Sequence, residues 1–107
     1  MICRMWHGWT TPANADTYET LLKQEIFPGI ADRRIEGYKG IQLLRRDVGD
    51  EVEFITLMWF DSLAAVRVFA GEDYEHGVVP VQAQAVLSRF DARSQHYEVE
   101  VDQFSQR

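Results

Sequence analysis

The sequence has few of the residues that mark several large classes of protein. Among 107 residues there are three prolines and one cysteine, Cys3, which cannot form an internal disulfide. Because Cys3 lies in an apolar run, we expect a buried, reduced thiol rather than a reactive one. Arg4 and His7 interrupt that first run, so no signal-peptide core is predicted. No stretch approaches the roughly eighteen apolar residues of a membrane span, and we therefore expect a cytoplasmic protein with no membrane partner.

Positive charge is also scarce. Lysine and arginine together number 11, against 17 aspartates and glutamates, so the formal net charge is -6. Proteins that bind nucleic acid or anionic lipid need clustered cations to displace counterions. The pairs Arg33-Arg34 and Arg45-Arg46 are too small to supply such a cluster. We expect no nucleic-acid partner.

One stretch, 52–71, organises the single domain that a chain of this length forms. Residues 52–60 are rich in β-branched and aromatic side chains and predict a central strand. Asp61 and Ser62 can cap a helix, which Gly71 ends. Both faces of the strand are apolar, with Phe54, Met58 and Phe60 on one and Ile55, Leu57 and Trp59 on the other. We therefore expect other parts of the protein to pack against both faces of this strand.

The rest of the chain predicts three more strands and two more helices. Alternation over 2–11 predicts a strand, and an apolar stripe predicts a helix from Asn14 to Phe27 that Pro28-Gly29 breaks. A strand over 38–47 and a turn over 48–50 lead into the central strand. Pro80 opens a short helix with Val81, Ala85, Val86 and Leu87 on its apolar side. A last strand is predicted over 90–101, and residues 102–107 are expected to be loose or to reach a partner subunit.

This order of elements is the split βαβ pattern of ferredoxin-like α+β domains, with a four-stranded antiparallel sheet. Helices on one side leave the other sheet face uncovered. A sheet face exposed to solvent usually has polar residues at every second position, and the first and third strands lack this pattern. A bare face with several large apolar residues exceeds what a soluble monomer usually tolerates. We therefore expect a homodimer that packs sheet face on sheet face.

Several short motifs point to a family. They are Trp6-His7-Gly8-Trp9-Thr10, Leu44-Arg45-Arg46, Phe60-Asp61-Ser62-Leu63, Phe69-Ala70-Gly71-Glu72-Asp73 and His96-Tyr97-Glu98-Val99. Together they resemble small proteins of the antibiotic biosynthesis monooxygenase superfamily, over nearly the whole chain. The resemblance implies a dimeric α+β barrel, in agreement with the sheet-face argument.

Characterised members of that superfamily include quinone-forming monooxygenases that use no metal or flavin, and haem-degrading enzymes. The haem-degrading signature is an Asn on the first strand, a Trp on the second helix and a later His ligand. These positions fall on His7, on Phe69, and on Val78 or Val79, and none of them matches. The resemblance thus favours an oxygenase without cofactor that oxidises a phenol or hydroquinone in an apolar cavity.

Two histidines are the candidate catalytic residues. His7 alternates with Cys3, Met5 and Trp9, so we expect it on the helix side, where it could take a phenolic proton. His96 lies on the last strand, which pairs beside the first in this fold, and is expected to assist. The alternatives are a core histidine satisfied by a carbonyl for His7, and a solvated histidine near the dimer seam for His96.

Aromatic residues and an acidic loop complete the candidate binding site. We expect substrate contacts from Trp9, Trp59, Phe60, Phe69, Tyr74 and His76, although each aromatic residue could also serve as ordinary core. No histidine pair has metal-ligand spacing, so no metal site is predicted. A non-catalytic dimeric module that binds a ligand remains the alternative function.

Overall fold

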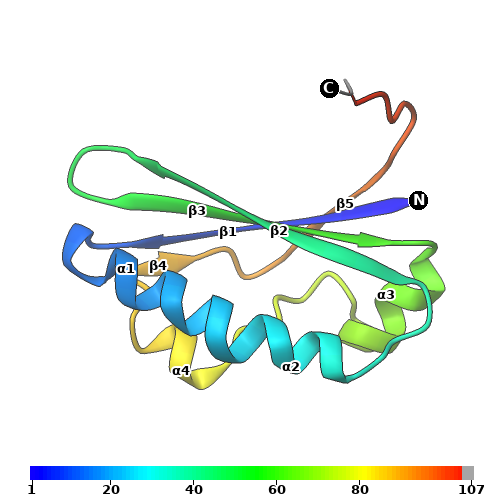
Figure 1. Cartoon of the computed structure of the whole chain (residues 1–107), viewed down its shortest axis with the longest axis horizontal. Helices are drawn as coiled ribbons and strands as arrows, with labels where there is room; N and C mark the ends of the chain where they lie inside the picture. Colours follow the sequence, from blue (N-terminus) through cyan, green and yellow to red (C-terminus); the bar gives the residue numbers. More distant parts are fainter. Residues whose placement is uncertain (105–107) are drawn as a thin grey trace.

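The computed structural model describes residues 1–104 as one antiparallel sheet with every described helix on a single side (Figure 1). Along the chain the elements are β1 (Ile2–Thr10), α1 (Pro12–Leu21), η1 (Leu22–Ile26), α2 (Phe27–Asp32), β2 (Tyr38–Asp47), β3 (Val52–Phe60), α3 (Leu63–Ala70), α4 (Val81–Gln84), β4 (Arg89–Phe90) and β5 (Gln95–Glu98). The predicted α+β class and ferredoxin-like order are confirmed. None of the described helices is long and apolar enough to cross a membrane.

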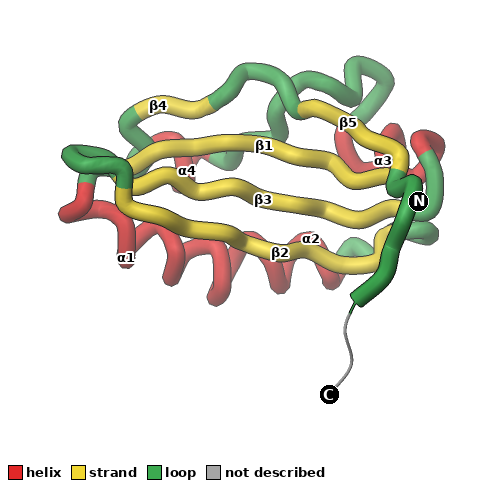
Figure 2. Tube along the Cα trace, turned by 90° about the horizontal axis from the view of Figure 1, so that it is seen from above, coloured by secondary structure: helices red, strands yellow, loops and turns green. Residues whose placement is uncertain are grey.

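The sheet has the order β2-β3-β1-β4, and β5 also pairs with β1. Figure 2 shows β2, β3 and β1 side by side, with β4 and β5 following one another along the outer edge of β1. Side chains of directly paired residues point to the same face of a sheet. Arg4 pairs with Met58 and with His96, so these three side chains lie on the helix side.

The first helical region does not end where proline and glycine predicted. It runs without a break from Pro12 to Asp32, through the π-helical segment η1. The Phe27 N–H donates to the Leu22 carbonyl, five residues back, which widens the turn just before Pro28. In a regular α-helix the proline ring would clash with the carbonyl four residues earlier. We infer that the wider turn relieves this clash, which the sequence pattern alone did not indicate.

The central hairpin and the following helix agree with the prediction. β2 and β3 occupy the expected ranges, and the Ser62 hydroxyl accepts from the Ala65 N–H at the start of α3. Gly71 ends this helix with φ of 91°, a conformation that favours glycine. The core beneath the sheet contains two clusters, centred on Phe54 with Tyr18 and on Phe60 with Phe69.

The last part of the chain is less regular than predicted. Instead of one strand over 90–101, β4 and β5 are two short strands on either side of a turn. The interruption lets the Gly77 N–H donate to the Ala92 carbonyl and the Ser94 N–H donate to that of Glu75. In α4 the expected apolar position Val81 is 79% exposed, and Ala83 is the buried one. The predicted tail over 102–107 lies partly outside the described residues.

Candidate active site

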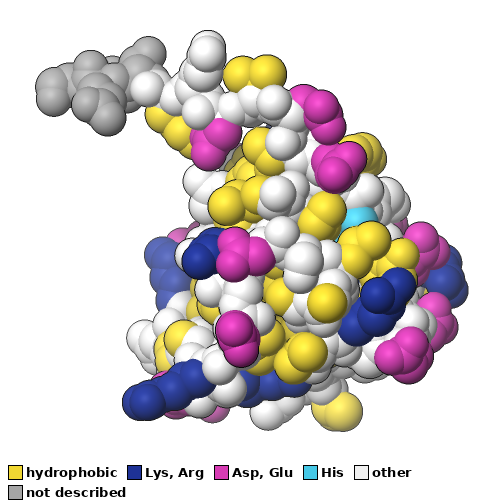
Figure 3. All heavy atoms as spheres, turned by 90° about the vertical axis from the view of Figure 1, so that its right-hand side faces the viewer, with side chains coloured by type: hydrophobic (Ala, Val, Ile, Leu, Met, Phe, Trp, Pro, Cys, Tyr) yellow, Lys and Arg dark blue, Asp and Glu magenta, His cyan; other side chains and the backbone are white. Residues whose placement is uncertain are grey.

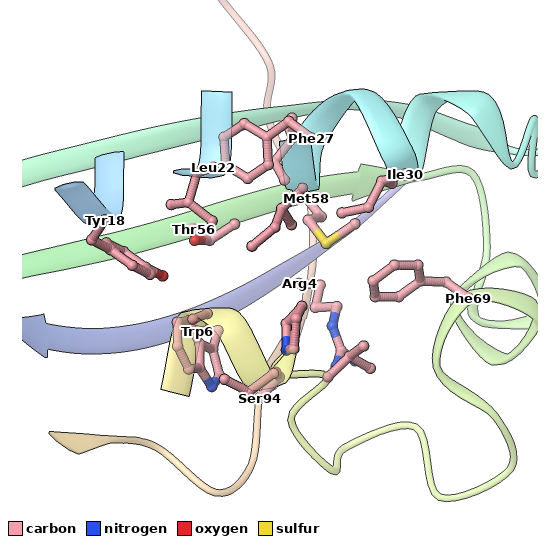
Figure 4. A pocket seen from close by; sticks show the side chains of 16 residues that line it. Arg4, Trp6, Tyr18, Leu22, Phe27, Ile30, Thr56, Met58, Phe69 and Ser94 are labelled. Atoms are coloured by element: carbon pink, nitrogen blue, oxygen red, sulfur yellow. The ribbon is translucent and has the colours of Figure 1, made fainter. Parts of the chain in front are cut away.

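A small cavity lies between the sheet and the helices, with a volume of about 60 Å³. Its lining is mostly apolar and aromatic, and Figure 4 shows Arg4 between Phe69 and Trp6, with Tyr18 towards the other end. Ser94 and Thr56 are the lining hydroxyl groups besides Tyr18. The cavity therefore has an apolar body and one charged wall.

Arg4 supplies that charge. Its side chain reaches from β1 beneath the loop after α3, and only 3% of the residue is exposed. Nη1 donates to the Tyr74 carbonyl, Nη2 donates to the His76 carbonyl at 3.2 Å, and the guanidinium lies 5.5 Å from the centre of the Phe69 ring. Desolvation lowers the pKa of Arg4 to about 10, so the group stays charged at neutral pH.

His96 is held directly against this guanidinium. Its Nε2 lies 3.0 Å from Arg4 Nη1, and because a guanidinium has no acceptor, Nε2 must be the acceptor. The proton of the neutral ring is then on Nδ1, which is buried without a hydrogen-bond partner among the described residues. Desolvation and the Arg4 charge both lower the pKa of His96, so the imidazole is kept neutral.

His7 does not face the helices, contrary to the prediction. It pairs with Ile55 on β3 and therefore lies on the open sheet face, opposite to Arg4 and His96. There Nδ1 lies 3.4 Å from an Asp91 oxygen, and the ring stacks on Trp9 at 5.9 Å. The two histidines lie on opposite faces for the same reason. His96 pairs with Arg4, which is three positions from His7 on β1, and an odd offset along a strand reverses the face.

The predicted binding aromatics divide between the two faces. Phe69 lines the cavity, and Phe60 is fully buried behind it, with ring centres 5.9 Å apart. Trp9 and Trp59 lie on the open face, where Arg89 stands 3.8 Å above the Trp9 ring and Trp59 Nε1 donates to Gln42. The sequence correctly predicts which residues of β1 and β3 share a face. The prediction that the face of Trp9 on β1 meets the helices is wrong.

Tyr74 and His76 approach the site through their backbone. Their carbonyls bind Arg4, and the Tyr74 ring packs edge-on against His96 at 5.1 Å. The His76 side chain itself is exposed. The acidic loop over residues 72–77 is thus bound to Arg4, the charged residue in the wall of the cavity.

Arg4 and Ser94 are the site residues that sequence reasoning missed, whereas Trp6 was among the aromatic residues expected to be able to line a pocket. Trp6 lines the cavity, and its Nε1 donates to the Asp91 carbonyl at 2.8 Å. The sequence did contain a signal for the face of β1 that meets the helices. The small residue Gly8 shares the face of Arg4 and Trp6, as does Thr10. A Cβ at Gly8 would lie 2.9 Å from the Trp6 ring and 3.0 Å from Leu87, so the helix side needs a small residue there.

The described residues contain no cluster of three or more histidine, cysteine, aspartate or glutamate side chains that could hold a metal ion. Cys3 is free and buried on the open-face side of β1, and burial raises the pKa of its thiol. Among the described residues, the charged and hydroxyl side chains that line the cavity are those of Arg4, Tyr18, Thr56 and Ser94.

Solved structures with the same arrangement of elements were found. One is a Bacillus cereus protein assigned to the antibiotic biosynthesis monooxygenases, with a TM-score of 0.66, 12% identity, and 97% of both chains covered. Another is the haem degrader MhuD from Mycobacterium tuberculosis with two haems bound, with a TM-score of 0.59, 22% identity, and 97% of this chain and all of that chain covered. A third is a variant of MhuD with two manganese protoporphyrin IX groups per active site. It has a TM-score of 0.60 and 22% identity, with 98% of this chain and 100% of that chain covered.

No family model matches the chain, and neither does any curated protein sequence. At these identities the three structures establish the architecture, while activity has to be argued from the site. The chain has the fold of the antibiotic biosynthesis monooxygenase structures.

Proposed function

We propose that the chain is a monooxygenase without cofactor that oxidises a small phenol in the helix-side cavity. The observation that carries this proposal is a buried cation, Arg4, set in the wall of an apolar and aromatic cavity. Such a wall holds an aromatic ring and stabilises negative charge that develops on a ring oxygen as electrons pass to O2. The fold of the oxygenase structures is compatible with this chemistry.

The overall reaction balances without an added reductant. A phenol with a free para position and one O2 give a quinone and one water. One oxygen atom enters the ring, the other leaves in water, and the phenol supplies all four electrons. Arg4 stabilises the developing negative charge, in place of the base or hydrogen-bond partner that the sequence predicted at His7. His96 acts as the hydrogen-bond partner of Arg4 rather than as a base.

Oxygen uptake tests this function. Purified protein incubated with a panel of small phenols, hydroxybenzoates included, should consume O2 and release quinone, seen by its absorbance. The rate should fall by about a hundredfold in Arg4→Met, as when other transition-state donors are removed. Absence of uptake across the panel would refute the proposal.

A haem group does not fit the residues of this site. No histidine lines the cavity among the described residues, so the site offers no imidazole to ligate a haem iron. Of the positions that carry the haem-degrading signature, Phe69, Val78 and Val79 do line the cavity, while His7 faces away from it. The reaction proposed for this cavity therefore uses no haem.

A non-catalytic ligand-binding module is the second candidate. The observation that favours it is that the described part of the chain places no free base at the cavity: the His96 Nε2 already accepts from Arg4, and no carboxylate of residues 1–104 is among the lining residues. Tight binding of a phenol without any oxygen uptake would support this alternative over the enzyme.

We also propose a homodimer formed through the open sheet face. Leu57, Ile55 and Met5 lie there beside Trp59, without a described helix to cover them. The C-terminal segment leaves the domain on this side and encloses a groove of about 430 Å³ against Trp59. Figure 3 shows this segment projecting from the body with hydrophobic side chains along it. Phe104 is 80% exposed, and a second copy would cover both the face and the segment.

A further inference from the structure

Arg4 is a buried cation without a buried counter-charge. No aspartate or glutamate in residues 1–104 lies within 4.0 Å of its nitrogens, in contrast to Arg45, Arg46, Arg89 and Arg93. Its described partners are two carbonyls, an imidazole and the Phe69 ring, all of them neutral. A buried charge normally has a partner of opposite sign, because removal from water otherwise costs several kcal/mol.

The guanidinium also has hydrogen-bonding capacity to spare. It carries five N–H groups. Three of them serve Tyr74, His96 and His76, and within the described chain no contact to Nε is found. Two N–H groups therefore remain, which is the number that a carboxylate needs for a bidentate pair.

A second unsatisfied group lies in the same wall. Ser94 is 4% exposed, lines the cavity, and its buried Oγ has no hydrogen-bond partner in the described structure. A hydroxyl that neither donates nor accepts within the protein is free to donate to an anion in the cavity. Arg4 and Ser94 thus both line the cavity, as Figure 4 shows.

The ligand must bring its negative charge with it. An unperturbed phenol has a pKa of about 10, and the imidazole of His96 beside Arg4 is occupied as an acceptor and held neutral. Among residues 1–104 no carboxylate lines the cavity, so no described base is placed to ionise a neutral phenol. A carboxylic acid, by contrast, is already ionised at neutral pH.

We propose that Arg4 and Ser94 form a carboxylate subsite, and that the ligand of the cavity is a hydroxylated aromatic acid. The carboxylate pairs with the guanidinium, and the ring lies along the apolar lining towards Phe69 and Tyr18. A hydroxyl in the ortho position stays within reach of the same positive charge. This assignment rests on the proposed function only in taking the helix-side cavity as the substrate site.

The test compares two ligands of nearly the same shape, the anion ortho-hydroxybenzoate and the neutral ortho-hydroxybenzamide, by calorimetry under anaerobic conditions, where no turnover occurs. We expect the acid to bind at least about tenfold more tightly than the amide, the effect of one good charge-assisted pair. Equal affinity for the two, or binding of neither, would overturn the subsite.

Variants locate the effect. In Arg4→Met the preference for the acid should disappear, and in Ser94→Ala it should weaken. Arg33→Met is the matched control, because the Arg33 guanidinium lies 5.2 Å from the centre of the same Phe69 ring but outside the cavity. If Arg4→Met does not fold, the comparison of the acid with the amide on the unmodified protein still tests the carboxylate subsite. A selective acid site without oxygen uptake would preserve the subsite and refute the oxygenase.

Discussion

Arg4 and His96 lie directly opposite one another on β1 and β5, and their side chains meet at 3.0 Å on the helix side of the sheet. The contact joins a permanent cation to a ring that can itself become charged. It therefore couples the protonation of His96 to the charged wall of the cavity. The strand pairing that creates this contact also turns His7 to the opposite face.

The first prediction concerns the pKa of His96. Desolvation, then the Arg4 charge, lowers it, so the unfolded chain binds this proton at a higher pH than the native protein does. The contribution of His96 to stability is thus complete above about pH 6.5 and falls as the pH drops from there towards the native pKa. An NMR titration should show the imidazole titrating below its ordinary value, and Arg4→Met should raise it. An unshifted value in both proteins would contradict the contact.

The second prediction concerns Phe69, whose ring packs on Phe60 and under two arginines. Phe69→Ala should reduce the free energy of unfolding by about 3 kcal/mol, because it removes buried apolar surface and enlarges the cavity. The neighbouring Val68 is 64% exposed, and Val68→Ala should change stability by less than about 0.5 kcal/mol. Urea unfolding of the two variants checks this, and similar losses in both would show that Phe69 is not core.

The third prediction uses two glycines. Gly8→Ala should cost about 1–3 kcal/mol, because the new methyl group presses on the Trp6 ring and on Leu87. Gly29→Ala should instead stabilise the protein by about 0.5–1 kcal/mol, since Gly29 is helical and a Cβ there meets nothing within 4 Å. Thermal unfolding of both variants is the measurement. A neutral Gly8→Ala would contradict the close packing at the cavity.

The fourth prediction tests the open sheet face. The unmodified protein should sediment as a dimer at micromolar concentration, and Leu57→Glu should convert it to a monomer by placing a charge in the interface. Val81→Glu, on α4 away from that face, should leave the dimer intact. A monomeric unmodified protein would remove the argument for sheet-to-sheet packing.

The fifth prediction separates the two histidines. His96→Gln should lower the rate of phenol oxidation severalfold by loosening Arg4, with a changed pH profile that identifies a positioning role. His7→Gln should leave the rate unchanged, because His7 contacts Asp91 and Trp9 on the opposite face. A large loss of activity in His7→Gln would instead restore the role that the sequence suggested.

Much of the fold was predictable because its signals are local. The caps at Ser62 and Gly71, the hairpin turn before Val52 and the apolar run of β3 depend on neighbouring residues only. The continuation of the helix past Pro28 was not predictable, since it depends on a π-helical turn without a known sequence mark. The division of the last strand depends on pairing with the distant loop at Gly77, which alternation does not report.

The site was harder to predict than the fold, because it depends on which face of β1 meets the helices. Alternation assigned Arg4 and His7 to opposite faces correctly, but it cannot say which face is inside. An arginine in an apolar run looked like an interruption, whereas burial beneath the loop at Tyr74 makes it the charged wall of the cavity. The pairing of Arg4 with Met58 and His96 in the sheet shows that the Arg4 side chain lies on the helix side.

The most direct test of the proposed oxidation is the origin of the new quinone oxygen. Purified protein with ortho-hydroxybenzoate and O2 labelled with oxygen-18 should give a quinone carrying one labelled atom by mass spectrometry. The product should be lost in Arg4→Met and retained in Arg33→Met. An unlabelled product, or no product from the unmodified protein, would contradict oxygenation in this cavity.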